Sequence, residues 1–304
     1  MPFEAPYTFG GLPDIPWRKT RFVLLPIPYE ATVSYQVGTK FAPEAVLHAS
    51  RNMELYDEEL EIQPASAGLK TLPGLLPERA GPAKMARTIT LVAERLLNRG
   101  KFILSLGGEH SVSPPLVKAH RKFYSQLRVL HLDAHADLRE SYEGTPYNHA
   151  CAVRRIVETG CQVYSVGIRS LCQEESLYLK KEKPPVTIHW AHTMKPDWPE
   201  KLSQKAPAGV YYLTFDLDFF DPAILPDTGT PEPGGFFWWE TLRFLRLFLQ
   251  RKDVELVGAD IVELAPKNFF SPACFLTAKL AYKIIGYLVA KKNLAAAKTH
   301  PARG

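Results

Sequence analysis

The chain has 304 residues, of which 46% are hydrophobic and 23% are charged, and its formal net charge of +5 is mild. This length supports one large buried core, the dispersed basic residues argue against a nucleic-acid partner, and no run of about 18 apolar residues predicts a membrane span. Residues 1–11 lack the pattern of a signal peptide and the four cysteines lack CxxC spacing, so we expect a cytoplasmic protein with reduced thiols.

Short apolar runs, several of them apolar at nearly every position, alternate with amphipathic stretches along the chain. Continuous apolar runs of this length are typical of strands that are buried on both faces of a parallel sheet. Their alternation with helical patterns favours an α/β fold in which helices flank that sheet. The predicted strands are residues 21–25, 102–106, 129–133, 162–168, 186–190, 210–216 and 256–262.

Between these strands, apolar residues follow a helical period. From Met85 to Leu96 they recur at spacings of four, three and four residues, which predicts a helix over residues 82–99 with one buried stripe. Similar patterns predict helices over residues 237–250 and 275–288. Together the predicted elements describe strands and helices in alternation, as a three-layer fold requires.

No internal repeat and no Pro/Ser-rich linker divides the chain. We therefore expect residues 1–304 to form a single-domain, three-layer α-β-α fold with a mainly parallel sheet. Residues 1–19 are expected to form an N-terminal extension and residues 291–304 a flexible tail. In open α/β sheets, ligands bind beyond the carboxyl ends of the strands, so functional residues are expected there.

Acidic residues and histidines gather at three of these strand ends. One strand leads into the run His131-Leu132-Asp133-Ala134-His135-Ala136-Asp137, another ends in Asp216-Leu217-Asp218, and a third is followed by Gly107-Gly108-Glu109-His110. In extended chain, every second side chain lies on the same face, about 6.5–7 Å from the next. The candidate metal ligands are His110, Asp133, His135, Asp137, Asp216 and Asp218.

For a single aspartate, a solvated loop position is the simpler interpretation. Four aspartates at the mouths of buried strands are different, because each unpaired buried carboxylate costs several kcal/mol. No basic run lies beside them in the sequence to supply the counter-charge. Carboxylate and imidazole groups are common ligands of divalent metal ions, so the pattern predicts a metal site.

These three segments resemble the signature motifs of the ureohydrolase family, which includes arginases and agmatinases. The third segment continues as in that family through residues 216–235, with the run Thr228-Gly229-Thr230-Pro231-Glu232-Pro233-Gly234-Gly235. The likeness extends in order from Pro26 to Glu263 and covers most of the chain. One departure is Asp227, where the family usually has glycine, serine or alanine, and we expect it to affect a loop rather than the metals.

The resemblance implies an arginase-like fold that holds two manganese ions. Matching positions make His110, Asp133, Asp137 and Asp216 the ligands of one ion, and His135 and Asp218 complete the other, with Asp133 and Asp216 as bridges. Four aspartates, two divalent ions and one bridging hydroxide leave a single negative charge, which a substrate guanidinium neutralises. The hydroxide attacks the guanidinium carbon, because two metals that share a water lower the pKa of that water.

The resemblance also assigns three catalytic roles. Glu263 matches the glutamate that pairs with the substrate guanidinium, although a salt-bridged acid at a strand end is the alternative interpretation. His149 matches the histidine that shuttles protons at the site entrance, with a simple packing histidine as its alternative. Asp137 relays a proton to the departing amine, while Ser111 and Thr214 are expected hydrogen-bond donors beside the ligands.

The loop over residues 138–147 lacks the Asn- and Ser-rich pattern of arginases and resembles the agmatinase branch, particularly its compact prokaryotic form. Glu140 and Glu143 in this loop suit a substrate with an ammonium group at its far end. The expected reaction is therefore hydrolysis of agmatine to putrescine and urea, a step of polyamine biosynthesis, and aminopropylagmatine fits the same loop. The family resemblance further implies a homo-oligomer, either a trimer or a hexamer.

Alternatives remain open from the sequence. Within the family, the substrate is guanidinobutyrate or a related guanidino acid if Arg139 or Arg154 faces the pocket and binds a carboxylate, and arginine is a further alternative. Deacetylases share the fold but use a single zinc, and the complete ligand set speaks against them. A metal-binding protein without catalytic activity would hydrolyse no guanidine at all.

Overall fold

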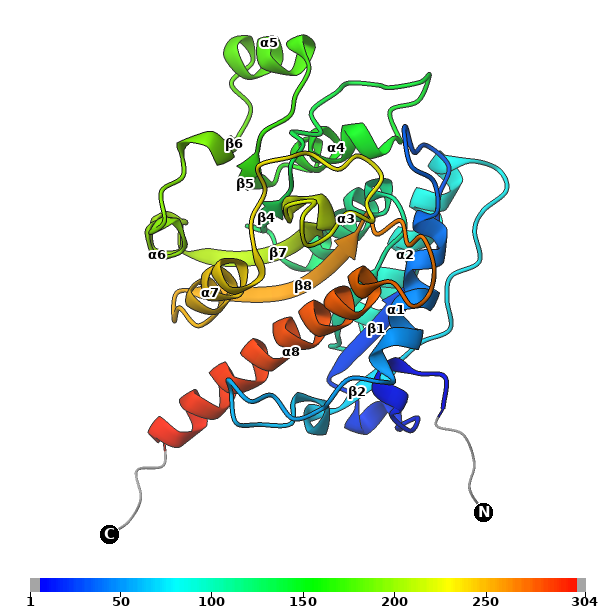
Figure 1. Cartoon of the computed structure of the whole chain (residues 1–304), viewed down its shortest axis with the longest axis vertical. Coiled ribbons are helices and arrows are strands. Elements are labelled where there is room, and N and C mark those ends of the chain that lie inside the picture. Colours follow the sequence, from blue (N-terminus) through cyan, green and yellow to red (C-terminus); the bar gives the residue numbers. More distant parts are fainter. Residues whose placement is uncertain (1–5, 300–304) are drawn as a thin grey trace.

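The computed structural model describes residues 6–299, with side chains through Lys291. At the centre of these residues lies an eight-stranded sheet in the order β2-β1-β3-β8-β7-β4-β5-β6, in which every neighbouring pair of strands is parallel (Figure 1). The strands are β1 (Phe22–Pro26), β2 (Leu69–Thr71), β3 (Phe102–Leu106), β4 (Arg128–Leu132), β5 (Gln162–Ile168), β6 (Val186–Trp190), β7 (Gly209–Asp216) and β8 (Val254–Val262).

Helices cover both faces of this sheet, and the alternation of side chains along the strands divides the core accordingly. Val23 of β1 packs in the cluster that contains α2, α3 and α4, whereas the next residue, Leu24, packs in the cluster that contains α1, α6, α7 and α8. The predicted three-layer α/β fold with a parallel sheet is therefore confirmed. The helices are α1 (Ala42–Ser50), α2 (Pro82–Leu97), α3 (Ser113–Phe123), α4 (Ala152–Glu158), α5 (Gln173–Lys181), α6 (Trp198–Lys205), α7 (Trp238–Leu249) and α8 (Pro272–Thr299).

Each predicted strand occurs within two residues of its predicted bounds, and the three predicted helices correspond to α2, α7 and α8. Strand β2 was not predicted because it has only three residues and lies at the sheet edge, where it pairs with β1 alone. Helices α1, α3, α4, α5 and α6 were also not predicted. Several of them are short, so their apolar residues complete too few turns for the helical period to stand out.

Helix α8 contains an apolar stretch that the sequence analysis did not identify. By length and composition, Pro272–Lys291 could cross a membrane, but 83% of its apolar window is buried inside the fold. The sequence did not predict it as a continuous apolar run because Lys279 and Lys283 interrupt it. Lys283 is itself buried, and its ammonium group donates to Asp57 at 2.8 Å and to Glu59 at 3.0 Å. The apolar surface of α8 therefore belongs to the core, and its buried lysine is paired.

The two ends of the chain are partly ordered by the fold. In the N-terminal extension, Phe9 is fully buried in the core and stacks on Tyr282 of α8 with ring centroids 6.3 Å apart. At the other end, α8 continues as a helix to Thr299, so most of the stretch 291–304 that was expected to be a flexible tail is helical. The remainder of both predictions, residues 1–5 and 300–304, lies outside the described residues.

Candidate metal centre

The six predicted ligands lie together at the carboxyl ends of strands that are close neighbours in the sheet. His110 follows β3, the group from Asp133 to Asp137 follows β4, and Asp216 ends β7 with Asp218 just beyond it. In the sheet, β8 lies between β3 and β7, and β7 pairs directly with β4. All parallel strands end at the same edge, so segments that are more than 100 residues apart in sequence deliver their side chains to one place.

Three carboxylate oxygens surround one imidazole nitrogen. His110 Nδ1 lies 3.2 Å from Asp133 Oδ2, 3.0 Å from Asp137 Oδ2 and 3.2 Å from Asp216 Oδ2. His110 Nε2 lies 3.0 Å from Thr214 Oγ1, and that hydroxyl donates its only proton to Asp260 at 2.7 Å. Thr214 can therefore only accept from Nε2, which places a proton there, so that in the neutral ring Nδ1 carries the lone pair.

This arrangement fits a metal cation. His110 Nδ1 is buried without a hydrogen-bond partner, and in this tautomer it has no proton for the three carboxylates. Four lone pairs that converge in a buried space repel one another unless a cation lies among them. The donors are one imidazole nitrogen and carboxylate oxygens, a set that intermediate divalent metals accept. The residues present therefore fit the first of the two expected ions.

A second group of ligands adjoins the first. His135 Nδ1 lies 2.8 Å from Asp218 Oδ2 and 3.7 Å from Asp133 Oδ1. Asp133 thus presents one oxygen to His110 and the other to His135, and its carboxylate adjoins both ligand groups. Backbone N–H groups orient the carboxylates, because His135 donates to Asp133 at 2.5 Å, Ala134 donates to Asp218 at 2.9 Å and Asp218 donates to Asp216 at 2.9 Å.

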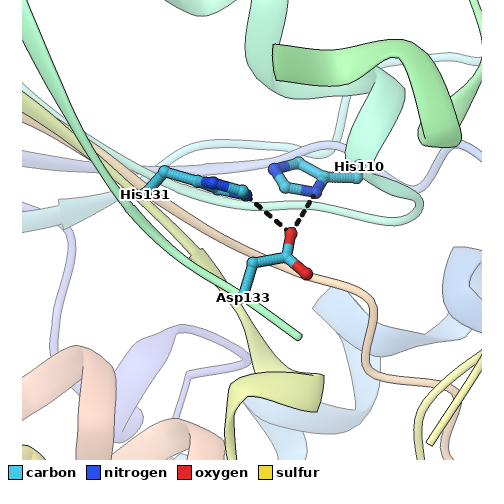
Figure 2. A group of neighbouring side chains, drawn as sticks. All are labelled: His110, His131 and Asp133. Carbon is cyan, nitrogen blue, oxygen red and sulfur yellow. Dashed lines mark hydrogen bonds and ion pairs between the residues drawn. The ribbon is translucent and has the colours of Figure 1, made fainter. Parts of the chain in front are cut away.

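His131 supports Asp133 rather than adding another free ligand. Figure 2 shows His131 and His110 directed at the same carboxylate, with His131 Nε2 2.7 Å from Asp133 Oδ2. The other ring nitrogen, Nδ1, lies 3.0 Å from Ser165 Oγ on the neighbouring strand. Both nitrogens of this buried ring are therefore engaged, and the ring holds Asp133 in place. Residues two apart at the end of a strand face the same side, and His131 and Asp133 accordingly meet.

The carboxylates and histidines of the cluster shift one another's pKa values strongly. Burial, together with Asp218 and Asp133, raises the pKa of Asp216 well above its usual range. Burial and the neighbouring Asp133 raise the pKa of Asp137 to about 6. Burial opposes a charged His110, yet the surrounding carboxylates raise the pKa of this histidine well above its ordinary value. Perturbed pKa values of this kind are characteristic of functional sites.

Glu263 lies directly after β8, with its carboxylate beside the ligands. It is 6% exposed, and its Oε1 accepts the backbone N–H of His110 at 2.6 Å. Burial raises the pKa of Glu263 to about 8. The backbone of Glu263 has φ +66°, and Asp137 has φ +51°. Left-handed values are uncommon for residues other than glycine, and such strain is found preferentially at active sites.

His149 lies in a short 3-10 turn at the rim of the same site. Its Nδ1 is 3.4 Å from Thr32 Oγ1 and its Nε2 is 3.1 Å from Ser34 Oγ. Asn148 caps this turn, because its side chain accepts the N–H of Ala150. Burial lowers the pKa of His149 to about 4, although a hydrogen bond to the Thr32 backbone opposes this shift. The ring is therefore neutral near pH 7.

These residues enclose a pocket of about 280 Å³. The metal-ligand candidates form part of its wall, and polar residues from several loops complete it. Its lining includes His110, His135, Asp137, Asp216, Asp218, Ser34, Arg139, Tyr142, His149, Cys172, Glu175, Thr230 and Glu263. The structure thus brings five of the six predicted ligands, Glu263 and His149 to the wall of one cavity, and the sixth ligand, Asp133, is fully buried beside them.

Glu140 and Glu143, which were predicted to contact the substrate, are not among the residues that line this pocket. Glu140 is exposed and lines a separate groove between the loop and α5, and Glu143 is exposed on the tight turn that joins Tyr142 to Thr145. The prediction relied on their charge without knowing the path of the loop. Arg139 lines the pocket instead, with its guanidinium 4.5 Å from the centre of the Tyr142 ring.

Several residues that organise the site were not assigned a role from the sequence. Glu109 was visible in the Gly-Gly-Glu-His run, yet only the structure shows that it is fully buried and bonded to Thr32. Asp260 accepts hydroxyl protons from Thr214 and from Tyr212. Arg169 donates to the backbone carbonyl groups of Asp218 and Glu232, which ties together the two ends of the third motif. Partners so distant in sequence leave no local signal.

Asp227 has a local structural partner. Its buried carboxylate accepts a hydrogen bond from Ser271, one residue before α8, and Lys267 lies 3.7 Å away. Its backbone carbonyl accepts the N–H of Ala265 at 2.8 Å. Asp227, which departs from the family pattern, therefore connects two loops near Glu263. It is not among the residues that line the metal pocket.

Comparisons with known proteins agree with this architecture. The arginase family model matches residues 20–290. An N(1)-aminopropylagmatine ureohydrolase from Synechocystis sp. is 40% identical over 274 residues, which cover 87% of this chain and 88% of that protein. An agmatinase from Pyrococcus horikoshii is 34% identical over 283 residues, which cover 90% and 94%. The crystal structure of agmatine ureohydrolase of Thermoplasma volcanium has a TM-score of 0.83 at 29% identity, and the match covers 92% of this chain and 94% of that one.

Proposed function

The chain belongs to the arginase family, and we propose that this ureohydrolase uses two manganese ions to release urea from a guanidine that carries a cationic tail. The observation that supports this most directly is the pair of ligand groups that share Asp133, with Glu263 beside them in the same pocket. One ion would be held by His110, Asp133, Asp137 and Asp216, and the other by Asp133, His135, Asp216 and Asp218.

The bound ions would supply the nucleophile, because two divalent metals lower the pKa of water enough to activate it near neutral pH. Glu263 binds and orients the guanidinium. A carboxylate and a guanidinium form charge-assisted hydrogen bonds of matching planar geometry, and burial of Glu263 excludes competing water. Although burial raises the pKa of Glu263 to about 8, an adjacent guanidinium stabilises its ionised form.

Proton transfer is assigned to His149 and Asp137. His149 is neutral near pH 7 because burial lowers its pKa to about 4, so it can accept a proton at the pocket rim. Asp137 lines the pocket and relays a proton to the amine that leaves. Both residues contact the cavity in which the guanidinium must bind, so neither role requires a large movement of the chain.

Two related substrates suit the proposed activity. Agmatine would give putrescine and urea, and aminopropylagmatine carries an additional amine in its tail. Relatives named for each substrate resemble this chain, and the 40% identical one is an N(1)-aminopropylagmatine ureohydrolase. Because Glu140 and Glu143 lie away from the pocket, Glu175 is the acid that lines it beyond the ligands and Glu263. The likeness to that relative favours aminopropylagmatine over agmatine.

One observation favours a different substrate class. Arg139 lines the pocket, and a guanidino acid such as guanidinobutyrate would place its carboxylate where an arginine could bind it. Arg154 is not among the residues that line the pocket; it lines the groove beside α5, which Arg139 also borders, and its guanidinium lies 3.6 Å from the centre of the Tyr178 ring. A guanidino acid is therefore the second candidate. Of Arg139 and Arg154, Arg139 is the one that could bind its carboxylate.

A urea-release assay on the manganese-loaded protein tests these proposals. The panel contains aminopropylagmatine, agmatine, guanidinobutyrate and arginine. If Arg139 does not bind a carboxylate, we expect the two cationic guanidines to exceed arginine by about 100-fold or more in kcat/KM, because the α-carboxylate of arginine would then be buried unpaired at a cost of several kcal/mol. Preference for guanidinobutyrate, abolished by Arg139→Gln, would select the second candidate. Absence of urea from every compound would contradict the enzymatic proposal.

A further inference from the structure

Glu109 is a buried carboxylate whose acceptor positions are used by one loop and one neighbouring hydroxyl. It is fully buried, and it accepts the backbone N–H groups of Ala31 and Thr32, both at 2.6 Å. It also accepts the hydroxyl protons of Thr32 at 2.8 Å and Ser111 at 2.5 Å. A carboxylate offers only acceptors, so each of these four partners must donate. Glu109 thereby determines the direction of the Thr32 hydroxyl.

The Thr32 hydroxyl then has two lone pairs and no proton left for other partners. His149 uses both of them. The backbone N–H of His149 donates to Thr32 Oγ1 at 3.1 Å, and ring atom Nδ1 lies 3.4 Å from the same oxygen, at the long end for this type of bond. An unprotonated Nδ1 would direct its lone pair at an oxygen that cannot donate. A protonated Nδ1 completes the hydrogen bonding of Thr32.

We propose that Thr32, oriented by Glu109, is a positioning residue that fixes the tautomer of His149. In that tautomer the proton is on Nδ1, and Nε2 presents its lone pair beside Ser34 at the pocket. Ser34 does not determine this outcome, because its exposed hydroxyl can donate or accept. The inference rests on the proposed function, in which His149 accepts a proton from the reacting groups.

The same arrangement occurs at a second histidine in this chain. Asp260 accepts the hydroxyl proton of Thr214 at 2.7 Å, and Thr214 Oγ1 lies 3.0 Å from His110 Nε2. There the opposite ring nitrogen is protonated, so Nδ1 is free to face the carboxylates. In both cases a threonine between a buried acid and an imidazole selects which nitrogen keeps its lone pair.

The tautomer determines whether His149 can act as a base. With its proton on Nδ1, His149 offers an unprotonated Nε2 to the pocket. In the other tautomer, Nε2 already carries a proton and cannot accept one, while the lone pair faces Thr32. Loss of the Thr32 hydroxyl should therefore lower turnover by increasing the share of the unproductive tautomer, without removing any group that binds the guanidinium.

The direct test is ¹⁵N NMR of the histidine rings in protein loaded with magnesium, a diamagnetic ion. The chemical shift of each ring nitrogen distinguishes a protonated from an unprotonated atom, and His149→Ala identifies the signals of His149. We expect wild-type His149 to be protonated on Nδ1 alone. Thr32→Val should shift the population toward the Nε2-protonated form, and Thr32→Ser should restore the wild-type signals. Ser34→Ala is the matched control and should leave the tautomer unchanged.

A proton on Nε2 in the wild type, or identical tautomer populations in wild type and Thr32→Val, would overturn the inference. These spectra do not depend on turnover, so the inference can fail while the proposed function stands, and the reverse also holds. In the manganese enzyme, we expect Thr32→Val to lower kcat by roughly 10- to 100-fold with little change in KM, and Thr32→Ser to recover most of it. An unchanged kcat for Thr32→Val would contradict the positioning role.

Discussion

Replacing Glu263 by glutamine isolates the charge that is proposed to bind the guanidinium. Glutamine has nearly the same shape as glutamate, and its carbonyl oxygen can still accept the His110 N–H that Glu263 accepts at 2.6 Å. The unusual backbone at φ +66° is retained because the substitution changes only the end of the side chain. The variant should therefore fold and hold its metal ligands as the wild type does.

The size of the effect follows from the burial of Glu263. Its side chain is almost entirely shielded, with 6% exposure, so the pair with a guanidinium forms out of contact with bulk water. Removal of one partner from a buried charge pair costs about 3–5 kcal/mol, because the other charge remains desolvated. At about 1.4 kcal/mol per tenfold, kcat/KM should fall between about 10² and several times 10³.

The measurement combines steady-state urea release with the manganese content of each preparation. Glu263→Gln should lose activity while it keeps the metal of the wild type. Glu140→Gln provides the matched control: it neutralises a glutamate that lies outside the pocket, and kcat/KM should remain within about twofold. The reasoning fails if Glu263→Gln retains full kcat/KM, or if its activity disappears together with its metal, since Glu263 would then act as a ligand.

Three further predictions address the ligands, the proton-transfer group and the fold. Asp133→Ala should lose both manganese binding and activity, because Asp133 joins the two ligand groups, and one tightly bound zinc with activity retained would contradict the two-metal proposal. His149→Ala should lower kcat by roughly 10²–10⁴-fold, and an unchanged rate would exclude it from the mechanism. Burial lowers the pKa of His120 to about 4, so the unfolded state takes up the proton first and stability is lost as pH falls from about 6.5 to about 4. The free energy of unfolding should fall by about 3 kcal/mol over this range. In His120→Gln, urea unfolding at these two pH values should show a smaller decrease.

The parts of the site that were predictable from the sequence are those set by local geometry. Alternation along an extended chain predicted that Asp133, His135 and Asp137 would share a face, and they do gather at the site, although they lie just after β4 and Asp137 has φ +51° rather than an extended backbone. Parallel strands all end at one edge of the sheet, so Asp216 was expected near Asp133 although 83 residues separate them. Each inference used only the direction of a strand and the spacing of residues within it.

Loop residues gave less reliable predictions because their direction depends on contacts that are remote in sequence. Glu140 and Glu143 were assigned to the substrate by charge, whereas both side chains are exposed and neither is among the residues that line the pocket. Thr32 had no recognisable motif, and its partners Glu109 and His149 lie 77 and 117 residues away. A hydrogen bond across such a distance has no periodicity or spacing by which a single sequence could reveal it.

The threonines between acid and histidine have a physical advantage in this particular site. A carboxylate in direct contact with an imidazole also selects a tautomer, but it stabilises the charged ring and raises its pKa, as the carboxylates around His110 do. At His149 such a contact would favour a ring that is already protonated and would add another anion near four aspartates. Glu109 accepts the hydroxyl proton of Thr32, and Thr32 in turn accepts the proton on His149 Nδ1, so the acid does not contact the ring directly. Burial keeps the pKa of His149 at about 4. A hydroxyl link therefore fixes the direction of the base and leaves it neutral, which a direct ion pair could not do.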